Sequence, residues 1–447
     1  MPEYLAPGVY VEEVSFRSKS IEGVSTTTTG FIGPSRFGPV DLEPDIVTSL
    51  GEFERVYGDR NRLEYPDGFV MDNYLWHAAR AFFEEGGKRL YVSRVFQPLS
   101  GEYPPDDFDA VTATAGEYPD GHARRSVPAD GAAAAINVRS RFPGRVGNFR
   151  VRFTLHMSQS ILGVEDAQAT TLTPKLNGLR NRDLVWISDT TSPVASTPGA
   201  GTFYIAESFF DKDANADSWR FLDNTLDPDA ALPLSALTPA VNPDDGDQVR
   251  VVTVTVTVLP SDGDALPSVW SGLALDAAHT LDGSPDSLTA KFGVQPTSLS
   301  QARTLPIVIT VGDDVVSGLD VLQALLDEND ALLEQLTDPL SSDAERSVEV
   351  LLEGGNDGRR PGAAEYEGRA DDTTSVKTGL KSFEDVEDIS IVAAPGSTFG
   401  MENGYRADAT QIINLLISHA SRMRYRIAVL DSGNGQSIAQ VRAMRGK

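Results

Sequence analysis

Residues 4–14 have the sequence YLAPGVYVEEV, and we expect the rest of the chain to be organised around the first 96 residues and above all around this segment. Pro7-Gly8 stops any helix, and the run of valine, tyrosine and glutamate that follows is typical of one extended strand. A strand with no hairpin partner beside it in the sequence cannot pair its backbone N–H and C=O groups locally, so it must join a sheet elsewhere in the fold or in another subunit. The residues expected to make this contact are Tyr4, Pro7, Gly8, Val9, Tyr10, Val11, Glu12, Glu13 and Val14.

The length and composition indicate a folded protein with more than one domain. A chain of 447 residues is too long for a single hydrophobic core. Its apolar content of 40% and charged content of 23% are near globular values and argue against extended disorder. No apolar run approaches the roughly 20 residues of a membrane-spanning helix, and the N-terminus lacks a secretion signal pattern. We therefore expect folding in the cytoplasm and no direct membrane insertion.

The charge balance is strongly acidic. Aspartate and glutamate number 65 against 38 lysine and arginine residues, which gives a formal net charge of −27. Nucleic acid and anionic membranes need a positive footprint, so neither is an expected partner. Because only eight of the basic residues are lysine, the surface is typical of proteins from salt-rich hosts, and equally of acidic proteins from GC-rich genomes. The absence of cysteine excludes disulfides, thiol catalysis and thiolate metal sites.

Two regions of α/β character enclose a β-rich middle. Residues 73–85 carry apolar side chains at helical spacing, and residues 88–95 have the pattern of a strand. Near the other end, residues 389–393 and 425–430 are consecutively apolar, as in strands that are covered on both faces. Between these regions, residues 249–259 alternate valine and threonine and form the clearest predicted strand.

These patterns predict an α/β (α+β) multidomain fold. A mixed-sheet core would be built from N- and C-terminal segments, with a β-rich insertion and an extended N-terminal arm. Residues 320–336 are expected to form one amphipathic helix that faces the core, with a short coiled-coil contact as the alternative. The expected segments are an arm and linker (1–25), a first core part (26–96), an inserted outer domain (97–347) and a second core part (348–447).

One segment has the oxygen spacing of a calcium loop. Its candidate ligands are Asp211, Asp213, Asn215 and Asp217. However, Ala216 stands where an EF-hand needs glycine, and Leu222 stands where it needs a bidentate glutamate. A solvated acidic loop is therefore the preferred interpretation, and no metal or cofactor is expected.

No catalytic set assembles from the remaining motifs. Residues 429–433 (VLDSG) resemble the active turn of an aspartic protease, but no second copy is present. Residues 354–358 (GGNDG) could cradle an anion, yet they lack the Lys-Ser/Thr pair of a phosphate loop, which favours a tight turn. In residues 396–400 (GSTFG) Thr398 takes the place of a nucleophilic serine, and the five histidines lack metal-ligand spacing. We therefore expect a protein that is not an enzyme.

A series of short motifs follows in a characteristic order. They are PGVYVEE (7–13), TGFIG (29–33), GP (38–39), VTS (47–49) with Phe53, Tyr57 and Gly58, FF (82–83), GG (86–87), YVSRV (91–95), PG (143–144), GN (147–148), LEGGNDG (352–358), VAAPG (392–396) and RIAVLD (426–431). In this order they resemble the contractile tail sheath family of phages, R-type pyocins and extracellular contractile injection systems. The resemblance covers roughly residues 1–96, 135–155 and 348–435, and each motif alone is weak.

The resemblance implies a structural subunit that stacks in helical rings around an inner tube and contracts to drive that tube through a target envelope. The arm at residues 4–14 would add a strand to the sheet of a neighbouring subunit. Implied partners are other sheath subunits, with a sheath paralogue as one alternative, the inner tube protein, and baseplate and cap proteins. The implied location is a phage tail or tail-like particle, with release from the cell left open. The competing hypothesis is a secreted calcium-binding β-rich adhesin or hydrolase.

The resemblance has one departure. Sheath sequences usually continue into another strand, helices and a C-terminal arm, whereas this sequence ends at Lys447. Three interpretations remain open: a truncated piece, a gene fragment, or a sheath variant whose mesh a longer paralogue completes. In each case this chain by itself is not expected to complete the weave between subunits.

Overall fold

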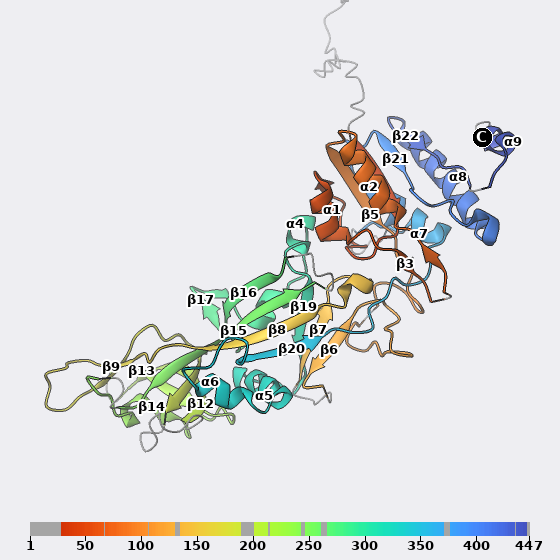
Figure 1. The fold of residues 1–447 in the computed structure, drawn as a ribbon. Coiled ribbons are helices and arrows are strands. Elements are labelled where there is room, and N and C mark those ends of the chain that lie inside the picture. Colours follow the sequence, from red (N-terminus) through yellow and green to blue (C-terminus); the bar gives the residue numbers. More distant parts are fainter. Residues whose placement is uncertain are drawn as a thin grey trace, which may run out of the picture.

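The computed structural model describes residues 28–444, apart from 67, 106, 130–134, 189–200, 213–214, 243–245, 261–265, 371–375 and 434. Within these residues the chain forms a smaller α/β core unit and a larger β-rich middle unit, which lie end to end (Figure 1). The predicted mixed α/β, multidomain architecture is confirmed. The predicted arm, residues 4–14, lies outside the described residues.

The described part of the core unit is built on five strands in the order β2-β5-β1-β21-β22. They are β1 (Thr28–Gly33), β2 (Ile46–Val47), β5 (Arg89–Arg94), β21 (Ile391–Ala393) and β22 (Ile427–Val429). β1 pairs in parallel with β5 on one side and with β21 on the other. Strands from distant parts of the chain therefore meet in one sheet, because parallel neighbours are joined by crossovers rather than by hairpins.

Helices cover the two faces of this sheet. α1 (Leu50–Tyr57) and α2 (Tyr74–Glu84) pack on one face, whereas α7 (Ala363–Glu367) and α8 (Arg406–Met423) pack on the other. The predicted helix at residues 73–85 is confirmed, and its start is fixed because the Asn73 side chain accepts the N–H of Trp76. Ser49 caps α1 in the same way by accepting the N–H of Glu52.

The middle unit is organised around a large antiparallel sheet. Its described strands are, in order, β14 (Leu232–Pro233), β13 (Ala216–Leu222), β12 (Gly201–Asp211), β11 (Leu184–Ser188), β15 (Val249–Leu259), β8 (Arg150–Met157) and β20 (Ser347–Leu351), and β16 (Ser268–Leu273) also pairs with β15. The predicted strand at residues 249–259 is confirmed at the centre of this sheet. β20 joins the large sheet instead of the core sheet, so the middle unit extends past residue 347 to Leu351.

Smaller elements complete both units. A second sheet contains β19 (Ile307–Val311), β7 (Ile136–Ser140) and β6 (Arg124–Val127), and short ribbons pair β3 (Leu63–Glu64) with β4 (Val70–Met71), β9 (Leu162–Val164) with β10 (Pro174–Leu176), and β17 (Thr280–Leu281) with β18 (Ser284–Pro285). Further helices are α3 (Leu288–Gly293), α4 (Leu299–Ala302), α5 (Gly318–Glu328), α6 (Leu332–Thr337) and α9 (Ile438–Met444). Among the helices described here, none has the length and apolarity to span a membrane.

The single helix predicted at residues 320–336 is wrong. The segment forms two helices, α5 and α6, and Asn329 between them has extended backbone angles. The Asn329 side chain accepts a hydrogen bond from the N–H of Ala331, and this side-chain bond takes the place of a backbone hydrogen bond of a continuous helix. The apolar pattern continues across the break because both helices bury leucines against the same core, which explains why the periodicity suggested one helix.

Candidate functional site: an open sheet edge and the junction behind it

The core sheet ends at β22, and no other described strand pairs with the outer side of β22. The N–H of Ile427 donates to the carbonyl of Ser390, so this residue faces β21. Since backbone groups alternate in direction along a strand, Ala428 directs its N–H and C=O away from the sheet. An edge of this kind is a template for a strand from another segment or another chain.

Apolar side chains on one face of β22 are exposed. Ile427 is 63% exposed and Val429 is 50% exposed, and Tyr425 just before them is 74% exposed. On the opposite face Ala428 and Leu430 pack against the cluster that α8 covers. The prediction that residues 425–430 are covered on both faces is therefore wrong, because within the described fold helices cover only the inner face of this last strand.

The inner side of β22 is fixed by a buried arginine. Arg426 donates to the carbonyls of Ile389, at 3.2 Å, and Phe383, at 2.7 Å. Its Nη1 also lies 2.7 Å from Nε2 of His419, so that ring nitrogen accepts. Burial, and after it the Arg426 charge, lower the pKa of His419 to about 4, which keeps the imidazole neutral at neutral pH. β22 is thus held in place on one side while its outer edge stays open.

Behind the core sheet, residues 354–358 form a junction between the two units. The side chain of Asn148 donates to the carbonyl of Gly355 at 3.1 Å and accepts its N–H at 2.9 Å. Asn356 donates to the carbonyl of Tyr118 at 2.8 Å. The tight turn predicted for residues 354–358 is wrong, because the backbone of this irregular segment bonds other segments instead of closing on itself. The N–H groups of Gly355 and Asn356 donate to Asn148 and Gly121, so they do not face an anion.

A buried carboxylate ties three segments together at this junction. Asp357 accepts the N–H of Glu64 at 3.1 Å and the N–H of Arg145 at 3.0 Å. Glu64 belongs to β3 of the core unit, and Arg145 starts the short 3-10 helix η1 (Arg145–Gly147), which leads into the middle unit. Burial raises the pKa of Asp357, and the two N–H donors oppose that rise.

Close backbone contacts at the junction require glycine. Gly144 has a φ of +130°, and a Cβ atom there would lie 1.9 Å from the carbonyl oxygen of Arg36. Gly358 has a φ of +70°, and a Cβ atom would lie 2.2 Å from the carbonyl oxygen of Gln97. A side chain at either position would therefore push apart the two backbone segments that meet there.

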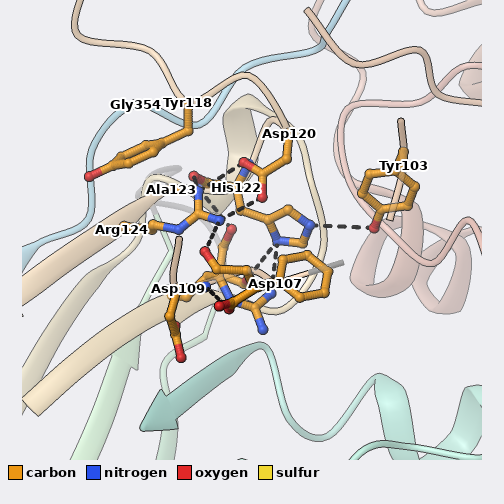
Figure 2. Close-up of polar contacts among 12 residues, drawn as sticks. Tyr103, Asp107, Asp109, Tyr118, Asp120, His122, Ala123, Arg124 and Gly354 are labelled. Atoms are coloured by element: carbon orange, nitrogen blue, oxygen red, sulfur yellow. Dashed lines mark hydrogen bonds and ion pairs between the residues drawn. The ribbon is translucent and has the colours of Figure 1, made fainter. Parts of the chain in front are cut away.

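A second buried network flanks residues 354–358, as Figure 2 shows. Arg124 makes two hydrogen bonds to the Asp120 carboxylate, at 2.6 and 2.8 Å. Nδ1 of His122 lies 2.8 Å from the carbonyl oxygen of Ser140. A carbonyl oxygen can only accept a hydrogen bond, so Nδ1 carries the proton. Burial is the main cause that lowers the pKa of His122 to about 3. A neutral, enclosed imidazole fits a structural role rather than proton transfer.

The calcium candidates do not converge in the described structure. Asp211 ends β12 and pairs with Ala216, whereas Asp217 of β13 pairs with Phe210. Side chains alternate between the two faces of a hairpin, so Asp211 and Asp217 point to opposite faces. Asn215 lies in the turn between the strands, and Asp213 is outside the described residues. Among the residues that are described, no cluster of three histidine, aspartate or glutamate side chains could hold a metal.

Two of the remaining motifs, residues 396–400 and 429–433, lie side by side, and the backbone of Gly396 bonds the Asp431 carboxylate. Thr398, in the turn after β21, donates its hydroxyl to the carbonyl of Ser432 at 3.1 Å. Asp431 follows β22, and burial raises its pKa.

No family model matches this chain, and no curated protein matches its sequence.

Sequence reasoning did not identify the junction as a site. Its parts are separated by up to about 300 residues, and each looks like an ordinary turn in isolation. A usable signal was present in the repeated pairing of glycine with asparagine at residues 147–148 and 354–358. Glycine permits close backbone approach, and asparagine bonds the carbonyl and N–H groups that such an approach buries.

Proposed function

We propose that this chain is a structural subunit of a contractile sheath, which stacks in rings around an inner tube. The observation that carries the proposal is the open edge of β22, where exposed apolar side chains flank outward-facing backbone groups. The proposed occupant of that edge is the arm at residues 4–14 of a neighbouring copy. The order of the sequence motifs is the reason for proposing the sheath family, and the open edge of β22 is the proposed binding site of the arm.

The arm and the edge match in chemistry. In an extended arm Val9 and Val11 lie on one face, and Tyr10 and Glu12 lie on the other. Paired beside β22, the two valines would continue the apolar surface of Ile427 and Val429 and remove part of it from water. Residues 15–27 could span about 40–45 Å if extended, which allows the arm to reach an adjacent copy.

The junction supports a subunit that moves as one body. Bonds at Asn148, Asn356 and Asp357 connect the core and middle units through buried backbone groups, and opening them would leave those groups unpaired. Movement during contraction would therefore take place between copies, about flexible linkers. If assembly traps an extended state of higher free energy, contraction needs no nucleotide.

The same proposal fixes the partners and the location. The proposed partners are neighbouring sheath subunits, the inner tube, and the baseplate and cap proteins. In one version of the proposal, one of the neighbouring subunits is a sheath paralogue. The proposed location is a phage tail or tail-like particle. The net charge of −27 favours contacts with basic patches on the tube or on neighbours. Such contacts would weaken as salt is raised.

Removal of the arm tests this function. A chain without residues 1–14 should remain folded, because the described fold begins at Thr28. When expressed with its partner proteins, it should form no tubes in electron micrographs, whereas the complete chain should form them. Tubes of normal length from the shortened chain would contradict the proposal.

A further inference from the structure

A cavity of about 630 Å³ lies between the two units, on the side of the junction where Tyr103 and Phe108 are found. Its core-unit wall includes Asp41 and Lys377, and its middle-unit wall includes Arg139 at the end of β7. A cavity of this volume is in the range of small-molecule sites. Its charged side chains are the feature that sets it apart from an ordinary packing gap.

Contacts outside the lining of this cavity connect the two units. The Asn148 side chain bonds the backbone of Gly355 in both directions. Arg303, which follows α4, forms an ion pair with Glu52 of α1.

Two of the three cations along the walls already have partners. Arg141 donates only to backbone carbonyls, those of Leu305, Val294, Phe292 and Ile307. Lys377 pairs with Asp385 at 2.8 Å. Neither side chain is therefore free to bind an anion without breaking contacts that hold the fold.

The third cation, Arg139, has no carboxylate partner among the residues described. Its guanidinium carbon lies 4.0 Å from the centre of the Phe108 ring, which positions it without neutralising it. Nη1 lies 3.4 Å from Nδ1 of His122, but that nitrogen carries the proton donated to Ser140 and cannot accept. Burial is the main cause that lowers the pKa of Arg139 to about 10, so this cation is partly dehydrated.

We propose that this cavity binds a small oxyanion, a carboxylate or phosphate, with Arg139 as its principal ligand. A planar guanidinium can offer two parallel N–H donors to such a group. Asp41 on the facing wall favours a ligand that also carries a hydroxyl group as a hydrogen-bond donor. The site is independent of the sheath proposal, since it uses one copy of the chain and none of the β22 edge.

Calorimetric titration of the full chain with inorganic phosphate, malonate and malate, at about 150 mM NaCl, tests this site. Malate carries a hydroxyl group that malonate lacks, so malate should bind more tightly if Asp41 takes part, and Asp41→Asn should reduce that preference. Arg139→Gln should weaken binding about 10- to 100-fold, the cost of losing a charged hydrogen-bond donor. Tighter binding of phosphate than of either dicarboxylate would assign the site to phosphate.

Two further variants make the result decisive. Arg139→Lys keeps the positive charge but loses the planar guanidinium group, so it should bind the anion with intermediate affinity. The same variant provides the test if Arg139→Gln does not fold. Arg150→Gln removes an exposed arginine that pairs with Glu349 on the surface, and it should leave affinity unchanged. No saturable binding of any of the three anions to the wild-type chain would overturn the proposal. Equal affinities in wild type, Arg139→Gln and Arg139→Lys would overturn it too.

Discussion

The junction and the β22 edge differ in how their backbone N–H and C=O groups are paired. At the junction, backbone groups from segments far apart in the sequence are buried and paired with Asn148, Asn356 and Asp357. At β22, Ala428 turns its backbone outward beside Ile427 and Val429, whose apolar side chains face water. One region is complete within a single copy, whereas the other offers groups that a second chain could pair.

The two regions should therefore tolerate substitution differently. A junction residue contacts both units, so its substitution should alter the stability of the single chain. A substitution on the open face of β22 removes few contacts within the chain and should act mainly on assembly.

Gly144→Ala should have the largest effect. The new Cβ would overlap the carbonyl of Arg36, and alanine disfavours a φ of +130°. We expect the free energy of unfolding to fall by about 3–5 kcal/mol, measured by urea denaturation.

Gly283→Ala is the matched control, because Gly283 also has a positive φ, +81°, but a Cβ atom there would meet no other atom within 4 Å. Its cost should be about 1 kcal/mol. Equal losses at the two positions would show that the close contact at the junction is unimportant.

Acid should lower the free energy of unfolding, and His122 should be one cause. Its pKa is lowered to about 3 in the fold, compared with about 6.5 in an unfolded chain, so the unfolded state binds the proton first as pH falls. The stabilisation is complete above pH 6.5 and is lost as pH falls towards 3. Between pH 7 and pH 5 the unfolding free energy should drop by about 2 kcal/mol.

His122→Gln should reduce this pH dependence in denaturation curves recorded at both pH values. It should not abolish the slope, since His419 has a pKa lowered to about 4 and contributes with the same sign. An unchanged slope in the variant would mean that His122 is not the buried neutral group described here.

Ala428→Pro separates assembly from folding. Proline removes the N–H that points away from β21 and keeps the β21–β22 ladder, so unfolding free energy should change by about 1 kcal/mol. Tube formation with the partner proteins should be lost, as seen in electron micrographs. Ala428→Val keeps the N–H and adds similar bulk, so it should still assemble; loss of tubes in both variants would point to packing instead of strand addition.

Ile427→Lys should change single-chain stability least. The side chain is 63% exposed, so the unfolding free energy should stay within about 0.5 kcal/mol of the wild-type value. Assembly should weaken because the apolar face presented to the arm is interrupted. A loss of stability well beyond this range would show that part of the chain already covers Ile427.

The sequence was informative where a local pattern decides the structure. Helix α2 and strand β15 follow directly from helical spacing and from valine-threonine alternation. The sequence was misleading where the outcome depends on neighbours. Residues 425–430 have the apolar run of a buried strand, yet nothing local says that the strand lies at the edge of the sheet. The single helix predicted at 320–336 failed because Asn329 bonds the backbone locally.

The candidate sites divide in the same way. Spacing alone suggested calcium at Asp211 and Asp217, but the hairpin places them on opposite faces. The buried ligands of the junction, such as Asp357, could not be found by spacing, since their partners lie in other segments of the chain. The arm at residues 4–14 remains a prediction from an orphan strand pattern.

An engineered disulfide between copies can detect pairing of the arm with β22, because the chain contains no cysteine and any cross-link must come from the two introduced residues. Val11→Cys is placed in one version of the chain and Val429→Cys in a version of different length, and the two are assembled together and oxidised. If the arm pairs with β22 of a neighbouring copy, a cross-linked species that contains one copy of each version should form. No such species, together with a cross-link formed inside single chains when both cysteines are in the same copy, would contradict this pairing.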